Sequence, residues 1–155
     1  MTSDSGVQVY VPLPNYASIG GETFWADQVG ISLYRIANVP LWAYGLNYHD
    51  VVRATPDAEG ILTIDEVVES SGHRTLRLMF PSDIGAEQQG ELLRKIYQPG
   101  GVTFERANGS LVAINIAPES DYLSVFDQLE AWADSGLLDF ETFHARVEGS
   151  FDDAP

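Results

Sequence analysis

Residues 69–78 (ESSGHRTLRL) place two serines, a histidine and two arginines within ten positions. A serine near a histidine suggests nucleophilic catalysis, and a histidine with arginines suggests the binding of an anion or a peptide. The catalytic hypothesis is weak because the chain has no Gly-x-Ser-x-Gly motif, and closeness in sequence does not create the geometry of a catalytic triad. We therefore treat Ser71, His73 and Arg77 as candidate ligand- or partner-binding residues.

The same segment also has a structural explanation as a hairpin. Ser70-Ser71-Gly72 fits a three-residue loop in which the glycine adopts the left-handed conformation. In the resulting register, Glu69 lies opposite His73 and Asp65 lies opposite Arg77, so each basic group gains an acidic neighbour. His73 and Arg77 would stand about 13 Å apart along one face of the strand. They could line a polar groove, but they could not share one reacting atom.

Two further positions are candidates for function. His49 and Asp50 could contribute to a metal site, but the three histidines show no HExxH or His-x-His spacing, and the acidic residues show no EF-hand pattern. An aspartate that caps a turn is the commoner case. Asn38 precedes a Val-Pro pair and could either hold a loop through its side chain or line a ligand site. We expect no metal and no cofactor.

The first half of the chain alternates apolar and polar residues in short runs separated by turn residues, which is typical of strands. The expected strands cover residues 7–13, 22–28, 31–37, 50–54 and 61–69. Residues 1–72 are too few for an independent sandwich. They are predicted to form a small curled β-sheet or partial barrel.

Residues 73–148 follow a different pattern, in which strands alternate with helices. After the strand that begins at His73, we expect a helix over 82–101, capped by Ser82 or Asp83, and then a hairpin over 102–118 that turns at Asn108-Gly109. A second helix over 120–136, capped by Ser120, and a final strand over 137–147 follow. This β-α-β-β-α-β order is that of ferredoxin-like domains. The fold class is therefore α+β, with both lobes forming one compact unit and residues 149–155 forming a frayed acidic tail.

Charge narrows the class of partner. The chain has 23 acidic and 8 basic residues, a net charge of −15, which disfavours nucleic acids and anionic membranes. Most of the excess lies in residues 81–155, and an acidic surface of this kind suits either plain solvation or a basic partner. No apolar run is long enough to span a bilayer, the N-terminus lacks the features of a signal peptide, and cysteine is absent. A cytoplasmic location is expected.

Several short motifs resemble those of an uncharacterised bacterial family, domain of unknown function 4265. They are E-x-x-W-A (22–26), Y-R-I-x-N-V-P (34–40), D-V-V-R (50–53) and S-G-H-R-T-L-R (71–77). The resemblance covers residues 22–140 and implies a small, stand-alone cytoplasmic protein without an assigned activity. It draws attention to Asn38, Asp50, Ser71, Gly72, His73 and Arg77.

Two functional hypotheses follow. The leading one is a non-enzymatic binding protein, regulatory or neutralising (an immunity-type protein is one form), that directs its acidic surface at a basic protein or peptide. The alternative is a small-molecule-binding protein or enzyme with a polar pocket between the lobes, lined by Asn38, Asp50, His73 and Arg77. The alternative requires these side chains to converge within about 10 Å on one concavity.

Overall fold

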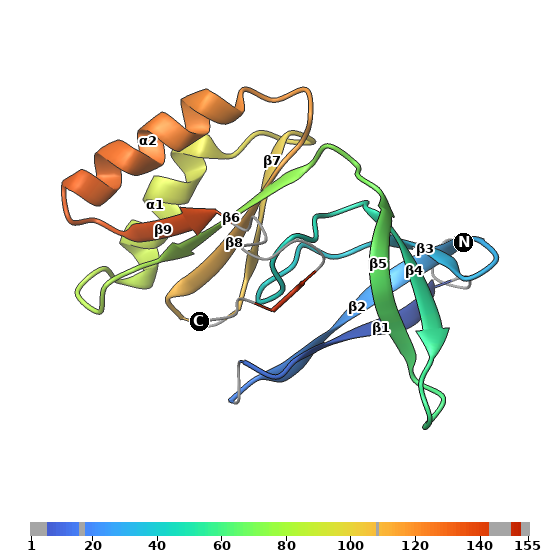
Figure 1. The fold of residues 1–155 in the computed structure, drawn as a ribbon. Coiled ribbons are helices and arrows are strands. Elements are labelled where there is room, and N and C mark those ends of the chain that lie inside the picture. The colour runs from blue at the N-terminus through green and yellow to red at the C-terminus, as the bar shows by residue number, and fades with distance from the viewer. Residues whose placement is uncertain (1–5, 16–17, 108, 143–149, 153–155) are drawn as a thin grey trace.

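The first half of the chain forms a closed five-stranded barrel (Figure 1). The structure, a computed structural model, describes residues 6–15, 18–107, 109–142 and 150–152. Consecutive strands pair antiparallel, and a short parallel pairing of the first and fifth strands at Tyr10 and Thr63 closes the barrel. The strands are β1 (Gly6–Leu13), β2 (Gly20–Gly30), β3 (Leu33–Ile36), β4 (Val51–Pro56) and β5 (Leu62–Glu69).

The barrel interior is filled by the alternate residues of its strands. Val9, Val11 and Leu13 of β1 are buried, and Phe24 and Ala26 of β2 face the same core. Full burial of an aliphatic or aromatic side chain contributes about 1.5–3 kcal/mol. The period-2 pattern that predicted these strands therefore also identifies what holds the barrel together.

The second half of the chain forms an antiparallel four-stranded sheet in the order β7-β8-β6-β9, with both helices on one face (Figure 1). This is the ferredoxin-like arrangement predicted from the element order, and the chain as a whole is α+β as expected. The elements are β6 (Arg74–Met79), α1 (Ala86–Ile96), β7 (Val102–Arg106), β8 (Leu111–Ile116), α2 (Tyr122–Asp134) and β9 (Asp139–Thr142). Asn108 and residues 143–147 of the predicted hairpin and last strand lie outside the described residues.

Both helices begin later than the sequence predicted. The N-cap of α1 is Gly85, without a side-chain hydrogen bond, and neither Ser82 nor Asp83 caps the helix. The residues before α1 form a turn instead, in which the N–H of Ile84 donates to the carbonyl oxygen of Pro81 and the Ile84 side chain is buried. At α2 the cap is Asp121, one residue after the predicted serine, and its carboxylate accepts the backbone N–H of Ser124.

The predicted hairpin of β5 and β6 is wrong. β5 pairs with β4 on one side and with β1 on the other, while β6 lies between β8 and β9. Neither strand has an edge left for the other, so Glu69 does not face His73 and Asp65 does not face Arg77. Gly72 is left-handed as predicted, at φ +87°, but it turns the chain from the barrel into the second sheet.

The face of the second sheet that carries no helix is covered by the connection between β3 and β4. All six residues of β8 are buried, so both of its faces are covered. Thr75 of β6 is buried on this side and donates a hydrogen bond to Asn47 Oδ1 of the connection at 2.7 Å. Figure 1 shows the same connection lying between the barrel and the sheet. The polar candidates of the sequence lie in this junction.

Part of the C-terminal segment packs against the barrel, which corrects the prediction of a frayed tail at 149–155. The carbonyl oxygen of Phe151 accepts the backbone N–H of Tyr44 at 2.8 Å, and the Phe151 ring packs against the barrel core. The carboxylate of Asp152 accepts the backbone N–H of Asn15 at 2.6 Å. An apolar ring and a well-placed carboxylate therefore hold residues 150–152 in place, and the rest of the predicted tail lies outside the described residues. Among the described helices, none is both long and apolar enough to cross a membrane.

Candidate functional site

Two side chains that accept backbone hydrogen bonds attach the first part of the β3–β4 connection, residues 37–50, to β2: Asn38 within the connection and Glu22 on β2. Asn38 Oδ1 accepts the N–H of Trp25 at 2.7 Å. The carboxylate of Glu22 accepts the consecutive N–H groups of residues 41–43 at 2.7–2.9 Å. Burial raises the pKa of Glu22 above its ordinary value, although these hydrogen bonds act in the opposite direction. Asn38 thus joins the connection to β2 through its side chain, which is one of the two roles that its sequence context suggested.

Asp50 joins the end of this connection to the segment that leads into β6. Its buried carboxylate accepts the backbone N–H of Ser71 at 2.8 Å and that of Asn47 at 2.9 Å. The Ser71 hydroxyl donates to the carbonyl oxygen of Tyr48 at 2.7 Å. Burial raises the pKa of Asp50, and the two backbone donors partly offset this effect. Asp50 therefore caps a turn, as expected, and also holds the two lobes together.

His73 lies against the same network. Its Nδ1 is 3.1 Å from Oδ1 of the buried Asn115. Because an amide oxygen can only accept, this hydrogen bond is donated by the Nδ1–H group of His73. The ring also meets those of Tyr48 and His49 edge to face, at centroid distances of 5.2 and 5.5 Å. His73 thus has one nitrogen fixed by the fold.

His49 is held in an unusual position beside His73. Its backbone has φ +69°, a conformation that few residues other than glycine adopt, and its ring stacks on Tyr48 at 3.9 Å. Burial, the neighbouring His73 and Arg35 lower the pKa of His49 below its ordinary value. Among the described residues, no group of three or more histidines or acids could hold a metal ion.

Arg77 belongs to a separate cluster further along β6. Its Nη2 donates to Glu141 Oε1 and Oε2 at 2.6 and 2.7 Å and to the Tyr44 hydroxyl at 2.7 Å. The Tyr44 hydroxyl in turn donates to the carboxylate of Glu141. The guanidinium also lies over the rings of Tyr44 and Trp42, at 5.5 and 6.0 Å from their centroids. This cluster joins β6 and β9 to the β3–β4 connection.

The predicted site is therefore assembled only in part. The structure brings Asp50, Ser71 and His73 together at the junction of the lobes, whereas Arg77 and Asn38 have separate sets of partners. The acids that the hairpin register assigned to the basic residues lie elsewhere. Asp65 accepts the Thr55 hydroxyl at 3.0 Å, and Arg77 pairs with Glu141.

Sequence reasoning missed Asn115 and Glu141, which complete these clusters. A polar residue at position 115 interrupts the apolar run LVAINI, which is the one local signal that a buried hydrogen bond is needed there. No local signal marks Glu141, because its partner lies 64 residues earlier in the chain.

Comparison with known proteins places these motifs in a family. Residues 22–140 match the family described as domain of unknown function (DUF4265). The chain belongs to this family. The match includes all of β3 to α2 and therefore every member of both polar clusters except Glu141.

The fold is shared with a solved structure described as "Novel crystal structure of a hypothetical protein from Neisseria gonorrhoeae". The two are 15% identical with a TM-score of 0.74, over 90% of this chain and 94% of that one. A search of curated proteins finds no match. The comparisons therefore support the DUF4265 family and the fold, and they leave the activity to be argued from the structure.

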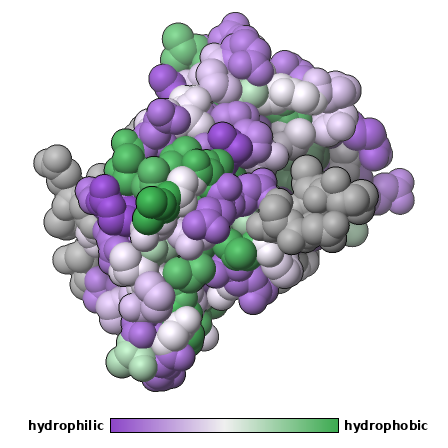
Figure 2. All heavy atoms as spheres, turned by 90° about the vertical axis from the view of Figure 1, so that its right-hand side faces the viewer, coloured by the Kyte–Doolittle hydropathy of each residue, from purple (hydrophilic) through white to green (hydrophobic). Residues whose placement is uncertain are grey.

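Two surfaces of this DUF4265 protein differ in chemistry. The barrel exposes several aliphatic side chains, and Figure 2 shows groups of hydrophobic residues between hydrophilic ones on that side. Exposed aliphatic residues of the barrel include Val29, Ile31, Ile61 and Val68. By contrast, the segment from Glu119 to Glu141, which contains α2, has seven acidic residues and neither lysine nor arginine.

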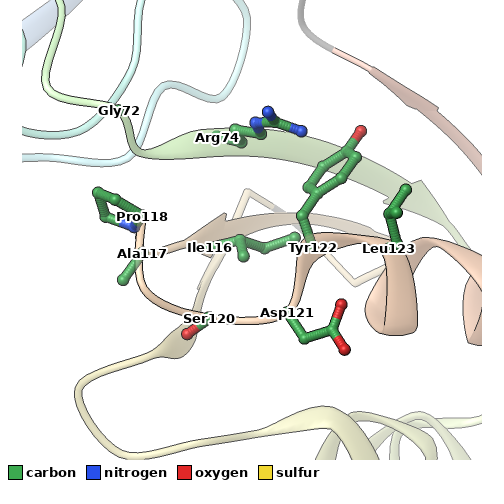
Figure 3. Close-up of a pocket in the computed structure, with 9 residues that line it drawn as sticks. All are labelled: Gly72, Arg74, Ile116, Ala117, Pro118, Ser120, Asp121, Tyr122 and Leu123. Atoms are coloured by element: carbon green, nitrogen blue, oxygen red, sulfur yellow. The ribbon is translucent and has the colours of Figure 1, made fainter.

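The exposed side of α2 concentrates this charge into one stripe. Leu123, Asp127, Glu130 and Asp134 are all exposed and follow the spacing i, i+4, i+7, i+11, which aligns them along the helix. The stripe extends for about 16 Å. Beside its N-terminal end lies an open hollow of 460 Å³, drawn in Figure 3, where the Arg74 guanidinium lies 4.3 Å from the centroid of the Tyr122 ring. We call Leu123, Asp127, Glu130 and Asp134 together the acidic stripe.

Proposed function

We propose that the chain is a small cytoplasmic, non-enzymatic binding protein that regulates or neutralises a basic protein or peptide, as an immunity-type protein does. The acidic stripe of α2 is the contact surface. The observation that carries this proposal is the alignment of three acids on one exposed helix face within a segment that has no lysine or arginine.

The arrangement of these acids disfavours the isolated helix. Asp127 and Glu130 are three residues apart, Glu130 and Asp134 are four apart, and each such like-charge pair costs about 0.2–0.5 kcal/mol. Asp134 also lies at the C-terminal end of α2, where the helix dipole favours cations, and no basic residue is present in the last turn. Cationic side chains of a basic partner would offset these unfavourable interactions through attraction to the same carboxylates.

The stripe also offers an apolar contact. Leu123 is 68% exposed at its N-terminal end, next to the hollow that Gly72, Arg74 and Pro118 help to line (Figure 3). A partner segment could place an apolar side chain here and basic side chains along the rest of the stripe. The net charge of −15 would accelerate its association at low ionic strength.

Affinity capture from native lysate with a matched pair of variants tests the proposal. The stripe variant is Asp127→Lys, Glu130→Lys and Asp134→Lys. The control variant is Glu59→Lys, Glu69→Lys and Glu91→Lys, which reverses three exposed acids in the β4–β5 turn, on β5 and on α1 and changes the net charge equally. We expect the wild type and the control variant to retain a basic protein that the stripe variant loses.

If the stripe variant still captured the same basic protein, the proposal would be contradicted. So would retention that does not change between low and high salt, because contacts between exposed charges weaken as salt screens them. Equal loss in both triple variants would show that net charge, and not α2, governs the capture.

One observation favours a second candidate, a small-ligand site at the lobe junction. Asp50, Ser71 and His73 converge there, and the hydrogen bond between Nδ1 and Asn115 fixes the orientation of the His73 ring. A small ligand would hydrogen-bond to the other ring nitrogen, Nε2. Imidazole ¹⁵N chemical shifts of His73, recorded with added small-molecule mixtures, would test this candidate. Shifts that never change would remove it.

A further inference from the structure

A second hollow, of 360 Å³, lies where the end of β1, the middle of β5 and the C-terminal segment meet. It is distinct from the acidic stripe and from the junction of the lobes. The lining residues are Val11, Pro12, Pro14, Asn15, Ile64, Asp65, Ser150, Phe151 and Asp152. The hollow therefore combines two carboxylates with the apolar side chains of Val11, Pro12, Pro14, Ile64 and Phe151, and none of the described residues that line it is basic.

Asp152 lacks one of the partners that a buried carboxylate requires. The residue is 8% exposed, and its Oδ2 accepts the backbone N–H of Asn15 at 2.6 Å. Its Oδ1 is buried, and no donor among the described residues reaches it. The nearby Ser150 hydroxyl donates to the carbonyl oxygen of Asp152, so it is engaged with the backbone. A buried charged oxygen without a donor is costly, and a bound group that donates a hydrogen bond to it would remove that cost.

Asp65 supplies the second carboxylate of the hollow. Its side chain is exposed, and its Oδ2 accepts the Thr55 hydroxyl at 3.0 Å. Two carboxylates attract a cation, while the prolines and aliphatic residues beside them suit a hydrocarbon chain. Metal ions such as Ca²⁺ prefer six or more oxygen ligands, a coordination shell that two carboxylates alone do not provide.

We propose that this hollow binds an alkylammonium group, either the side chain of a lysine or a small alkylamine. The ammonium has three N–H donors, enough for Asp152 Oδ1 and Asp65 together. The alkyl chain would lie against Pro12, Pro14 and Ile64. Oδ1 is covered by the protein, so binding requires the carboxylate to rotate about its Cβ–Cγ bond, which also releases Oδ2 from the Asn15 N–H.

Titration of the full chain with n-butylammonium chloride, followed by ¹H–¹⁵N NMR, tests the proposal. We expect saturable shifts of the Asn15 and Asp152 amide signals, and no such shifts with n-butanol, which has the same chain without the charge. Asp152→Asn and Asp65→Asn should each weaken binding at least tenfold. Because Asp65 is exposed, its variant remains informative if Asp152→Asn does not fold. Glu59→Gln, a substitution of an exposed acid on another turn, should leave binding unchanged.

Two further probes identify the source of the ammonium group. Tighter binding of Nα-acetyl-lysine methylamide than of n-butylammonium would indicate a lysine side chain, and the reverse order would indicate a free alkylamine. Absence of saturable shifts with both amines would overturn the proposal, as would tighter binding of Ca²⁺ or Mg²⁺ at the same residues. Loss of partner capture by the stripe variant does not bear on this site, so the two proposals fail independently.

Discussion

The carboxylate of Asp50 accepts the backbone N–H of Ser71 at 2.8 Å and so ties the end of the β3–β4 connection to the segment that enters β6. The two residues are 21 positions apart, and each belongs to a different part of the fold. The same carboxylate also accepts the N–H of Asn47. A single buried side chain thus satisfies backbone donors on both sides of the junction.

Replacing Asp50 with alanine should therefore destabilise the whole chain. Two backbone N–H groups would lose their acceptor, and each buried unsatisfied group costs about 1–3 kcal/mol. We expect a loss of about 2–5 kcal/mol in the free energy of unfolding, measured by urea denaturation. Ser71→Ala, which keeps the N–H and removes only the hydroxyl, should cost less. Equal effects of the two substitutions would contradict this assignment.

Arg77 and Glu141 should show energetic coupling. The Arg77 side chain is 13% exposed and that of Glu141 is 38% exposed, so the pair is only partly screened by solvent. Contacting residues in one hydrogen-bonded network couple by about 0.5–3 kcal/mol. A double-mutant cycle with Arg77→Met and Glu141→Gln should give a coupling in this range. Additive effects would show that the pair contributes nothing beyond its separate contacts.

Local sequence pattern predicted the elements well because each pattern is created by local burial. The alternation of Val7, Val9 and Val11 predicts β1, and the helical spacing of Val125, Leu129 and Trp132 predicts the buried side of α2. The order of the elements was then sufficient to predict the ferredoxin-like half. Pairing within that half follows from a known topology.

Partners distant in sequence could not be predicted in the same way. The hairpin prediction for β5 and β6 assumed that strands consecutive in sequence pair with each other, yet both edges of β5 are paired within the barrel, one with β4 and the other with β1. The same error assigned Arg77 to Asp65 when its true partner, Glu141, is brought alongside by β9. Side-chain partners of this kind depend on which strands become neighbours, and no local pattern encodes that.

The His49 environment predicts a pH dependence of stability. The folded-state pKa of His49 is lowered, chiefly by burial and then by His73, from an ordinary value of about 6.5. As pH falls through this range, the unfolded chain binds a proton that the folded chain does not, so stability decreases. His49→Asn, which tolerates the positive φ, should reduce this slope in urea denaturations between about pH 7.5 and 5.5. If the free energy of unfolding changed with pH equally in the wild type and in His49→Asn, the assignment to His49 would be contradicted.

The titration of Asp50 should make stability decrease as pH rises, which is opposite to the effect of His49, and it should do so at lower pH. Its raised folded-state pKa means that the folded chain retains a proton that the unfolded chain has lost, at pH values just above about 3.9. Its contribution to stability therefore decreases as pH rises through that window. Comparing wild type with Asp50→Asn between about pH 3.5 and 5.5 isolates the effect. The difference in free energy of unfolding between the two should change with pH, and a constant difference would contradict the assignment.

The acidic stripe should show a trade-off between stability and binding. Asp134→Lys replaces an acid with a base in the last turn of α2 and converts a repulsive pair with Glu130 into an attractive one. We expect the free energy of unfolding to increase by about 0.3–1 kcal/mol. Partner capture should decrease in the same variant. A variant that loses stability would show that Asp134 has a structural role in the chain.

The dissociation constant of the captured partner, measured for the two triple variants at one ionic strength, tests the central claim most directly. If α2 is the contact surface, reversal of Asp127, Glu130 and Asp134 should weaken binding at least tenfold, and the control reversals should change it by less than about threefold, which corresponds to about 0.7 kcal/mol. Equal weakening by the two variants would contradict the claim, because it would reduce the role of the stripe to its share of the net charge.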